Sequence, residues 1–261
     1  MTAPRALAAV ALSLGTLVTV TACSALSAPP TARRAPITQA TSASPTPSPS
    51  ASPAGAATLT EAMARAALVT DADLGEPWTP TQGAATWRDG VLKAKTQLPD
   101  CQRLLDALYA DDVFGAGSPP RAVVGLDDAW NEAQLRYQVV AREPAETDRT
   151  LAWLKTLPQK CGQFAATTVT GAVEGAQVTE LRLPETAGDA RQGLRIMLTG
   201  ESADGEPSTL TLDVAAVRVG EDAIGVTNGG LGDVQTDVTQ TVVDLGARRL
   251  AEVRKQGRVQ V

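Results

Sequence analysis

The sequence contains no histidine, which removes the commonest general base and the commonest transition-metal ligand of proteins. Catalytic arrangements that pair a serine or a cysteine with a histidine are therefore excluded. Cysteine is also scarce, because there are three and no two of them have the CxxC spacing of a redox motif. We therefore expect neither an enzyme nor a protein that holds a metal or another cofactor.

Acidic residues are absent from residues 1–57, which contribute +3 to the formal net charge of −6. Residues 58–261 consequently carry −9. An acidic folded region repels the phosphate backbone of a nucleic acid. We therefore do not expect a nucleic acid among the partners.

The first 22 residues have the pattern of an export signal. Residues 6–20 are almost entirely apolar and uncharged, a run too short for a comfortable membrane span but suited to a signal peptide. The run ends in Val20-Thr21-Ala22-Cys23, which resembles the bacterial lipobox, an aliphatic residue and two small residues before a cysteine. In lipoproteins with this motif, the cysteine sulfur receives diacylglycerol and the signal peptide is cleaved just before it.

We therefore expect residues 1–22 to be a lipoprotein signal peptide. Acyl chains such as palmitate on Cys23 would then anchor the mature chain to the outer face of the cytoplasmic membrane. An ordinary cleaved signal peptide with a chance cysteine, and an uncleaved membrane helix, are the alternatives. Residues 23–57 would form the lipidated cysteine and a disordered linker rich in Ala, Ser and Pro. At about 3.1 Å per residue in polyproline II, this linker reaches roughly 100 Å at most.

Helical and strand patterns alternate in residues 58–261, which we expect to form one domain. Apolar side chains at helical spacing predict four helices, which begin at the capping box Thr58–Glu61, at Pro99, near Pro144 and near Thr236. Alternating apolar and polar residues predict strands at 132–142, in the two arms of a hairpin about Asp204-Gly205, and at 223–228. Short turns join antiparallel neighbours, so the expected fold class is α+β, an antiparallel sheet with helices packed on it.

Two cysteines remain once Cys23 is assigned to the lipid. Cys101 and Cys161 both lie on the apolar sides of predicted helices. Outside the cytoplasm such a pair forms a disulfide more often than not. We therefore expect a Cys101–Cys161 disulfide, with two buried free thiols as the alternative.

Three short patterns match known functional motifs only in part. Asp71 to Glu76 lacks ligands of a calcium loop, and we expect a helix end with exposed acids there. Gly229 to Gly232 lacks the lysine of a phosphate loop, and we expect a flexible turn between a strand and a helix. The adjacent acids Asp111-Asp112 and Asp127-Asp128 lie beside turns, and we expect them to be solvated rather than catalytic.

The tryptophans are the remaining candidates for a binding site. Trp78, Trp87 and Trp130 either fill the core or line a cleft. The residues alone name no ligand-binding side chain.

Five segments, in this order and spacing, resemble the PknH-type extracellular sensor domain of some actinobacterial receptor kinases and stand-alone lipoproteins. They are ALVTDADLGEPW (67–78), LPDCQRLL (98–105), LAWLKTLPQKCGQF (151–164), LRLPETAGDARQGLRI (181–196) and DVAAVRVGEDAIGV (213–226). The resemblance implies a curved antiparallel sheet with helices, enclosing a cleft for a small extracellular ligand. The kinase-borne domains have a second disulfide, whereas this chain has cysteines for one.

Two functions from different classes follow from these observations. The first is a membrane-anchored sensor or binding module that holds a small molecule or a cell-wall fragment. The second is an adaptor that docks on a protein partner of the cell envelope. A cleft would favour the first, and an exposed apolar patch of several hundred Å² would favour the second.

Replacing the lipobox cysteine tests the membrane anchor. We expect Cys23→Ser to move the chain from the membrane fraction to the soluble fraction, because its only acylated thiol is lost. Cell fractionation with a fatty-acid label checks this. An unlabelled wild-type chain that sediments with membranes would contradict the prediction.

Overall fold

The computed structural model describes residues 58–259, except 86, 116, 118 and 203, with side chains as far as Gly257. The predicted signal peptide (1–22) and linker (23–57), and with them Cys23, lie outside the described residues. No helix in the described part of the chain is both long enough and apolar enough to cross a membrane.

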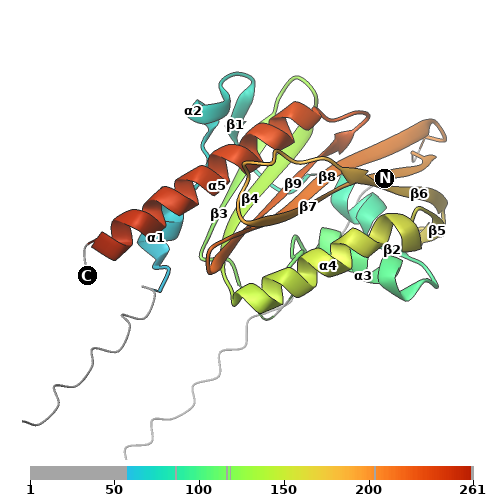
Figure 1. The fold of residues 1–261 in the computed structure, drawn as a ribbon. Coiled ribbons are helices and arrows are strands. Elements are labelled where there is room, and N and C mark those ends of the chain that lie inside the picture. The colour runs from blue at the N-terminus through green and yellow to red at the C-terminus, as the bar shows by residue number, and fades with distance from the viewer. Residues whose placement is uncertain (1–57, 86, 116, 118, 203, 260–261) are drawn as a thin grey trace, which may run out of the picture. The chain divides into compact units, whose positions relative to one another are not determined.

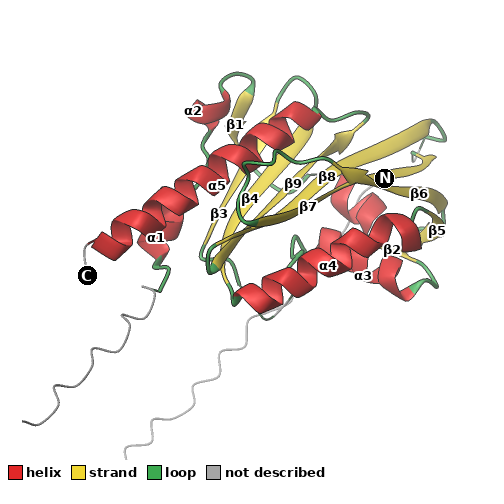
Figure 2. Ribbon diagram, in the orientation of Figure 1, coloured by secondary structure: helices red, strands yellow, loops and turns green. Residues whose placement is uncertain are grey.

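The described residues form one antiparallel sheet of nine strands (Figures 1 and 2). The strand order is β1-β3-β4-β9-β8-β7-β6-β5-β2, so the first two strands of the chain form the two edges. The strands are β1 (Trp78–Pro80), β2 (Ala94–Lys95), β3 (Ala122–Asp128), β4 (Ala133–Ala141), β5 (Gln163–Thr168), β6 (Val173–Leu181), β7 (Ala190–Glu201), β8 (Pro207–Val219) and β9 (Asp222–Leu231). The predicted α+β class, a sheet with helices packed on it, is confirmed.

Five α-helices and one π-helical turn accompany the described strands. They are α1 (Glu61–Ala66), α2 (Asp71–Leu74), η1 (Arg88–Leu92), α3 (Pro99–Tyr109), α4 (Pro144–Lys160) and α5 (Thr236–Val259). The predicted starts at Pro99 and Pro144 are confirmed. Proline suits the first helical position because the N–H group that it lacks would have no partner within the helix there. The predicted cap at Thr58 is wrong by two residues, since the hydroxyl of Thr60 accepts the bond from Met63 N.

Helices cover both faces of the sheet, so the molecule has two apolar cores. One core lies between the sheet and the pair α1 and α5, and the other between the sheet and α3 and α4. Strand β8 contributes to both by alternation, with Ala215 and Val217 facing α5, and Leu212 and Val214 facing α3 and α4. The central strands are therefore buried on both faces.

The glycine-rich segment at the end of β9 is part of the sheet. Gly229 pairs with Leu212 and Gln134, and the strand continues to Leu231, so the predicted flexible turn at 229–231 is wrong. A Cβ at position 229 would lie 2.2 Å from Leu212 Cδ2 and 3.2 Å from Trp87 Cη2. Glycine is needed here because these side chains occupy the space above the strand.

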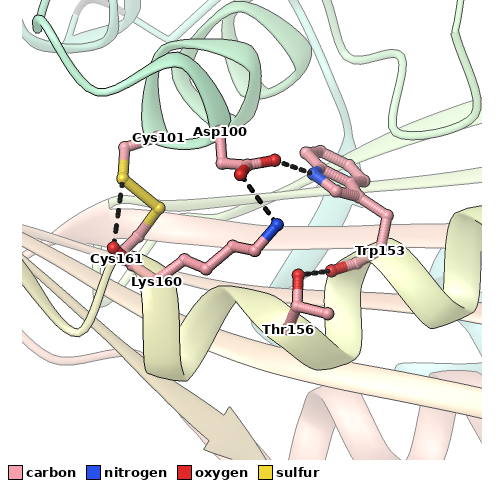
Figure 3. The surroundings of a disulfide bond; sticks show 6 residues. All are labelled: Asp100, Cys101, Trp153, Thr156, Lys160 and Cys161. Carbon is pink, nitrogen blue, oxygen red and sulfur yellow. Dashed lines mark hydrogen bonds and ion pairs between the residues drawn. A yellow bond between two sulfur atoms is a disulfide. The ribbon is translucent and has the colours of Figure 1, made fainter.

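A disulfide joins the first turn of α3 to the end of α4 (Figure 3). The Sγ atoms of Cys101 and Cys161 are 2.08 Å apart and the Cα atoms 5.6 Å apart. Beside it, Asp100 accepts hydrogen bonds from Trp153 Nε1 at 3.2 Å and from Lys160 Nζ at 2.8 Å (Figure 3). These bonds hold the pKa of the Asp100 carboxyl below its usual value. The two helices are therefore linked covalently and by one shared carboxylate.

The double change Cys101→Ser and Cys161→Ser tests the disulfide. The bond closes a loop of 60 residues, and losing such a loop should lower the free energy of unfolding by about 4 kcal/mol through unfolded-state entropy. Chemical denaturation of the variant and of the oxidised wild type measures this difference. The reduced wild type should unfold like the variant, and equal stability of the variant and the oxidised wild type would contradict the assignment.

Candidate functional site

Two neighbouring hollows form one cleft at the β1-β3-β4 end of the sheet. Their volumes are about 390 Å³ and about 250 Å³. Gly83, Ala84 and Gln134 line both hollows, so the two spaces adjoin at these residues. A cleft of this size is in the range of small-molecule sites.

Strands β3 and β4 form the floor of the cleft. Gln134 lies opposite Asp127 in the register of these strands, and Arg136 lies opposite Gly125. These positions alternate in phase with Val140, which packs against α3 and α4. The cleft is therefore on the α3 and α4 face, at the end of the sheet that these two helices leave open.

The wall of the cleft is formed by residues 81–85, 87 and 88, which follow β1. Asp127 holds its first part, accepting hydrogen bonds from Thr81 Oγ1 at 2.8 Å and Gln82 N at 3.2 Å. Gln134 Nε2 donates both to Asp127 Oδ1 at 2.9 Å and to Gly83 O at 3.0 Å. Floor and wall are thus joined by a chain of hydrogen bonds through one carboxylate and one amide.

Arg88 fixes the other end of the wall to the C-terminus of α3. Its guanidinium donates to Leu108 O at 3.2 Å and Tyr109 O at 2.7 Å, two carbonyls of the last helical turn. It also donates to Asp111 Oδ1 at 2.8 Å. With three acceptors engaged, Arg88 has a structural role.

Arg136 is the cation of the cleft that keeps binding capacity. It lies 3.6 Å from the same carboxylate, Asp111 Oδ2, a distance for ionic attraction but too long for a hydrogen bond. No described residue accepts a hydrogen bond from it, and 37% of its side chain is exposed. Its guanidinium is available to an anionic ligand group.

The opposite end of the cleft is acidic. Asp128 is 3% exposed and caps the β3–β4 turn, accepting bonds from Trp130 N at 2.9 Å, Asn131 N at 3.1 Å and Asn131 Nδ2 at 2.7 Å. The prediction of solvated acids is therefore wrong for Asp128. It is wrong as well for Asp111, whose side chain is 17% exposed, because backbone and arginine donors replace water. Glu132, by contrast, is exposed and lines the cleft.

The three tryptophans have different environments. Trp78 is buried in the α1 and α5 core, and Trp87 is buried on the other face, where it also lines the cleft beside Leu231. Trp130 is 73% exposed and lines none of the hollows found. Trp87 therefore both fills the core and lines the cleft, the two roles that the sequence left open.

Residues 71–76 contain the short helix α2 (Asp71–Leu74) and the turn that follows it. Asp73 forms a two-pronged ion pair with Arg249 of α5, with one N–O distance of 2.6 Å, which holds the pKa of its carboxyl well below the usual range. The prediction of a helix end with exposed acids is confirmed for Asp73 and Glu76, which are exposed, whereas Asp71 is half-buried. The ion pair fastens α2 to α5.

A second buried charge also belongs to the scaffold. Asp213 is fully buried and accepts two hydrogen bonds from Arg195, at 2.7 Å and 3.0 Å. Arg195 donates in addition to Val234 O, just before α5. This network fixes the start of the helix. Among the residues the structure describes, no group of three acidic, cysteine or histidine side chains is arranged to hold a metal ion.

Sequence reasoning missed the cleft residues because they look like ordinary solvent-facing strand positions. Gln134 and Arg136 lie on the polar side of the predicted strand 132–142. The segment that covers them is distant in sequence, since Gly83 and Gln134, which form a hydrogen bond, are 51 residues apart. No spacing within the strand shows that this face is covered.

Burial raises the pKa of the Glu174 carboxyl to a physiological value. It lies on β6 and is 7% exposed, and no described residue donates a hydrogen bond to its Oε2. Burial without a partner disfavours the charged form and raises the pKa from 4.5 to about 7. Glu174 lines none of the hollows found, so it affects stability rather than the cleft.

Glu174→Gln should remove a pH dependence of stability. The folded state binds a proton more tightly than the unfolded state, so the free energy of unfolding should fall as pH rises from about 4.5 to about 7. The fall should be at most about 3 kcal/mol and should stop above pH 7. Denaturation across pH 4.5–8 measures it. The exposed neighbour change Glu180→Gln should leave the profile intact, and an unchanged profile in Glu174→Gln would contradict the prediction.

No protein-family model matches the chain, and no curated protein is significantly similar to it. Among solved structures, the chain is similar to the extracellular domain of PknH from Mycobacterium tuberculosis, with 17% identity and a TM-score of 0.45; the match covers 77% of this chain and 100% of that one. It is also similar to a putative uncharacterized protein from Rhizobium leguminosarum, with 10% identity and a TM-score of 0.24, covering 48% of this chain and 97% of that one. Likeness at these levels assigns no ligand, partner or activity to this chain.

Proposed function

We propose that this protein is an extracytoplasmic lipoprotein, anchored through Cys23, whose domain binds a small extracellular ligand in the cleft between its wall (residues 81–85, 87 and 88) and strands β3 and β4. The protein has no catalytic role in this proposal. The observation that supports it is the cleft, two adjoining hollows with Arg136, which donates no hydrogen bond to a described residue, at one end, the exposed carboxylate of Glu132 at the other, and the apolar side chain of Trp87 in the wall.

The fixed wall of the cleft supports a binding role. Asp127, Gln134 and Arg88 hold this wall at both ends through hydrogen bonds. A pocket whose walls are already in place loses little conformational entropy when a ligand binds. The arrangement therefore favours recognition of a small molecule.

A protein-docking role is the second candidate, favoured by apolar side chains at the opposite end of the sheet. Val169 and Val173 are 63% and 68% exposed. Next to them, a shallow hollow of about 430 Å³ lies over β5, β6 and β7 and is lined by Phe164 and Met197. Apolar exposure of this kind is typical of an interaction surface.

Filling the cleft distinguishes the two candidates. A Cβ at Gly83 would meet no atom within 4 Å, so Gly83→Leu should fold normally while narrowing both hollows. Thermal-shift screening of the purified protein with a panel of cell-wall fragments, amino acids, peptides and sugars should find molecules that raise the melting temperature of the wild type. The variant should lose these shifts.

Gly90→Leu is the matched control, because a Cβ there also meets no atom and Gly90 lines neither hollow. It should keep the shifts. A panel that stabilises both variants as much as the wild type would place ligand binding outside the cleft and would contradict the proposal.

A further inference from the structure

We propose that the ligand of the cleft is a short linear peptide with free termini, its carboxylate bound by Arg136 and its ammonium by Glu132. This inference rests on the proposed function and specifies the chemical class of its ligand.

Arg136 supplies the site for the carboxylate. Arg88 and Asp111 neutralise each other in a direct hydrogen bond of 2.8 Å, which leaves the charge of Arg136 only partly balanced at 3.6 Å from the same carboxylate. Its forked guanidinium matches the two oxygens of a carboxylate. A carboxylate placed in the smaller hollow would therefore form the hydrogen bonds that no described residue forms with Arg136.

Glu132 supplies the site for the ammonium. It is exposed, lines the larger hollow, and forms no hydrogen bond or ion pair with a described residue. The two aspartates beside it, Asp127 and Asp128, have their oxygens engaged by backbone and side-chain donors. Glu132 is thus the acid at this end of the cleft with capacity left for a ligand cation.

The separation of the two ends fits about three peptide residues. From Ala133, next to Glu132, to Arg136 the chain is an extended strand, which rises roughly 10 Å over three residues. An extended tripeptide spans about 10 Å as well.

The middle of the cleft suits a peptide backbone. Gln134 lies between the two charged ends, and its Nε2 donates hydrogen bonds to Gly83 O and Asp127 Oδ1. No described residue donates a hydrogen bond to its Oε1. That oxygen can accept a peptide N–H. Trp87 and Leu231 provide apolar surface for small side chains.

The net charge of the domain also favours a ligand with both charges. Residues 58–261 carry −9, so a simple anion is repelled as it approaches. A zwitterion has no net charge and meets no such barrier.

Trialanine and its two blocked forms test the inference. Isothermal calorimetry on the purified protein should show binding of trialanine, and at least tenfold weaker binding of both N-acetyl-trialanine and trialanine amide. Arg136→Gln should weaken trialanine binding at least tenfold and remove the preference for a free carboxylate. Glu132→Gln should remove the preference for a free ammonium.

Matched changes outside the cleft control for effects on folding. Arg149→Gln on α4 and Glu180→Gln on β6 alter exposed side chains of the same types and should bind trialanine like the wild type. Equal binding of trialanine and its blocked forms would overturn the inference. So would binding of inorganic phosphate without binding of trialanine. Either result leaves the proposed function intact if another small molecule binds the wild type and Gly83→Leu abolishes that binding. Failure of the peptide inference can therefore be distinguished from failure of the proposed binding function.

Discussion

Burial of both faces of β8 and β9 is the constraint on which the rest of the structure depends. A strand in this position needs apolar side chains at successive residues rather than at alternate ones, and the run from Leu210 to Val219 meets this need with only a few polar exceptions. Helices α1 and α5 must then cover one face, and α3 and α4 the other. Where a polar side chain remains inside, as at Asp213, it is paired with an arginine, because an unpaired buried charge is costly.

The cleft follows from where the helices stop. On the α3 and α4 face the helices cover the middle of the sheet, and the outer strands β3 and β4 are left with polar side chains. The wall residues 81–85, 87 and 88 come back over these strands and are held above them by side chains, which leaves a space between wall and floor. The polar character of the cleft therefore reflects its place at the margin of the apolar core.

Sequence patterns predicted the elements whose signals are local. Pro99 and Pro144 indicate helix starts because proline is favoured at the first helical position. The β7–β8 hairpin is evident from strict alternation about a glycine turn. The two edge strands could not be predicted, since β1 has three residues and β2 has two, too few for any periodicity. Gly229 was misassigned for a related reason: its place in a strand depends on the close approach of Trp87, which is distant in sequence.

The same limit applies to the candidate site. The alternation of apolar and polar residues along a half-buried strand is the same whether its polar side chains face water or a covered cleft. The sequence therefore could not distinguish Arg136 from an ordinary surface arginine. Only the geometry around Asp111, which engages Arg88 fully and Arg136 incompletely, separates the structural arginine from the available one.

Helix α3 connects two features that are far apart in the fold. Its first turn carries the disulfide to α4, and its last carbonyls accept the hydrogen bonds of Arg88, which holds the wall of the cleft. Reduction of the sulfur–sulfur bond would therefore loosen the support of that wall as well as the packing of two helices. The redox state of the surroundings would therefore affect the geometry of the cleft as well as the stability of the fold.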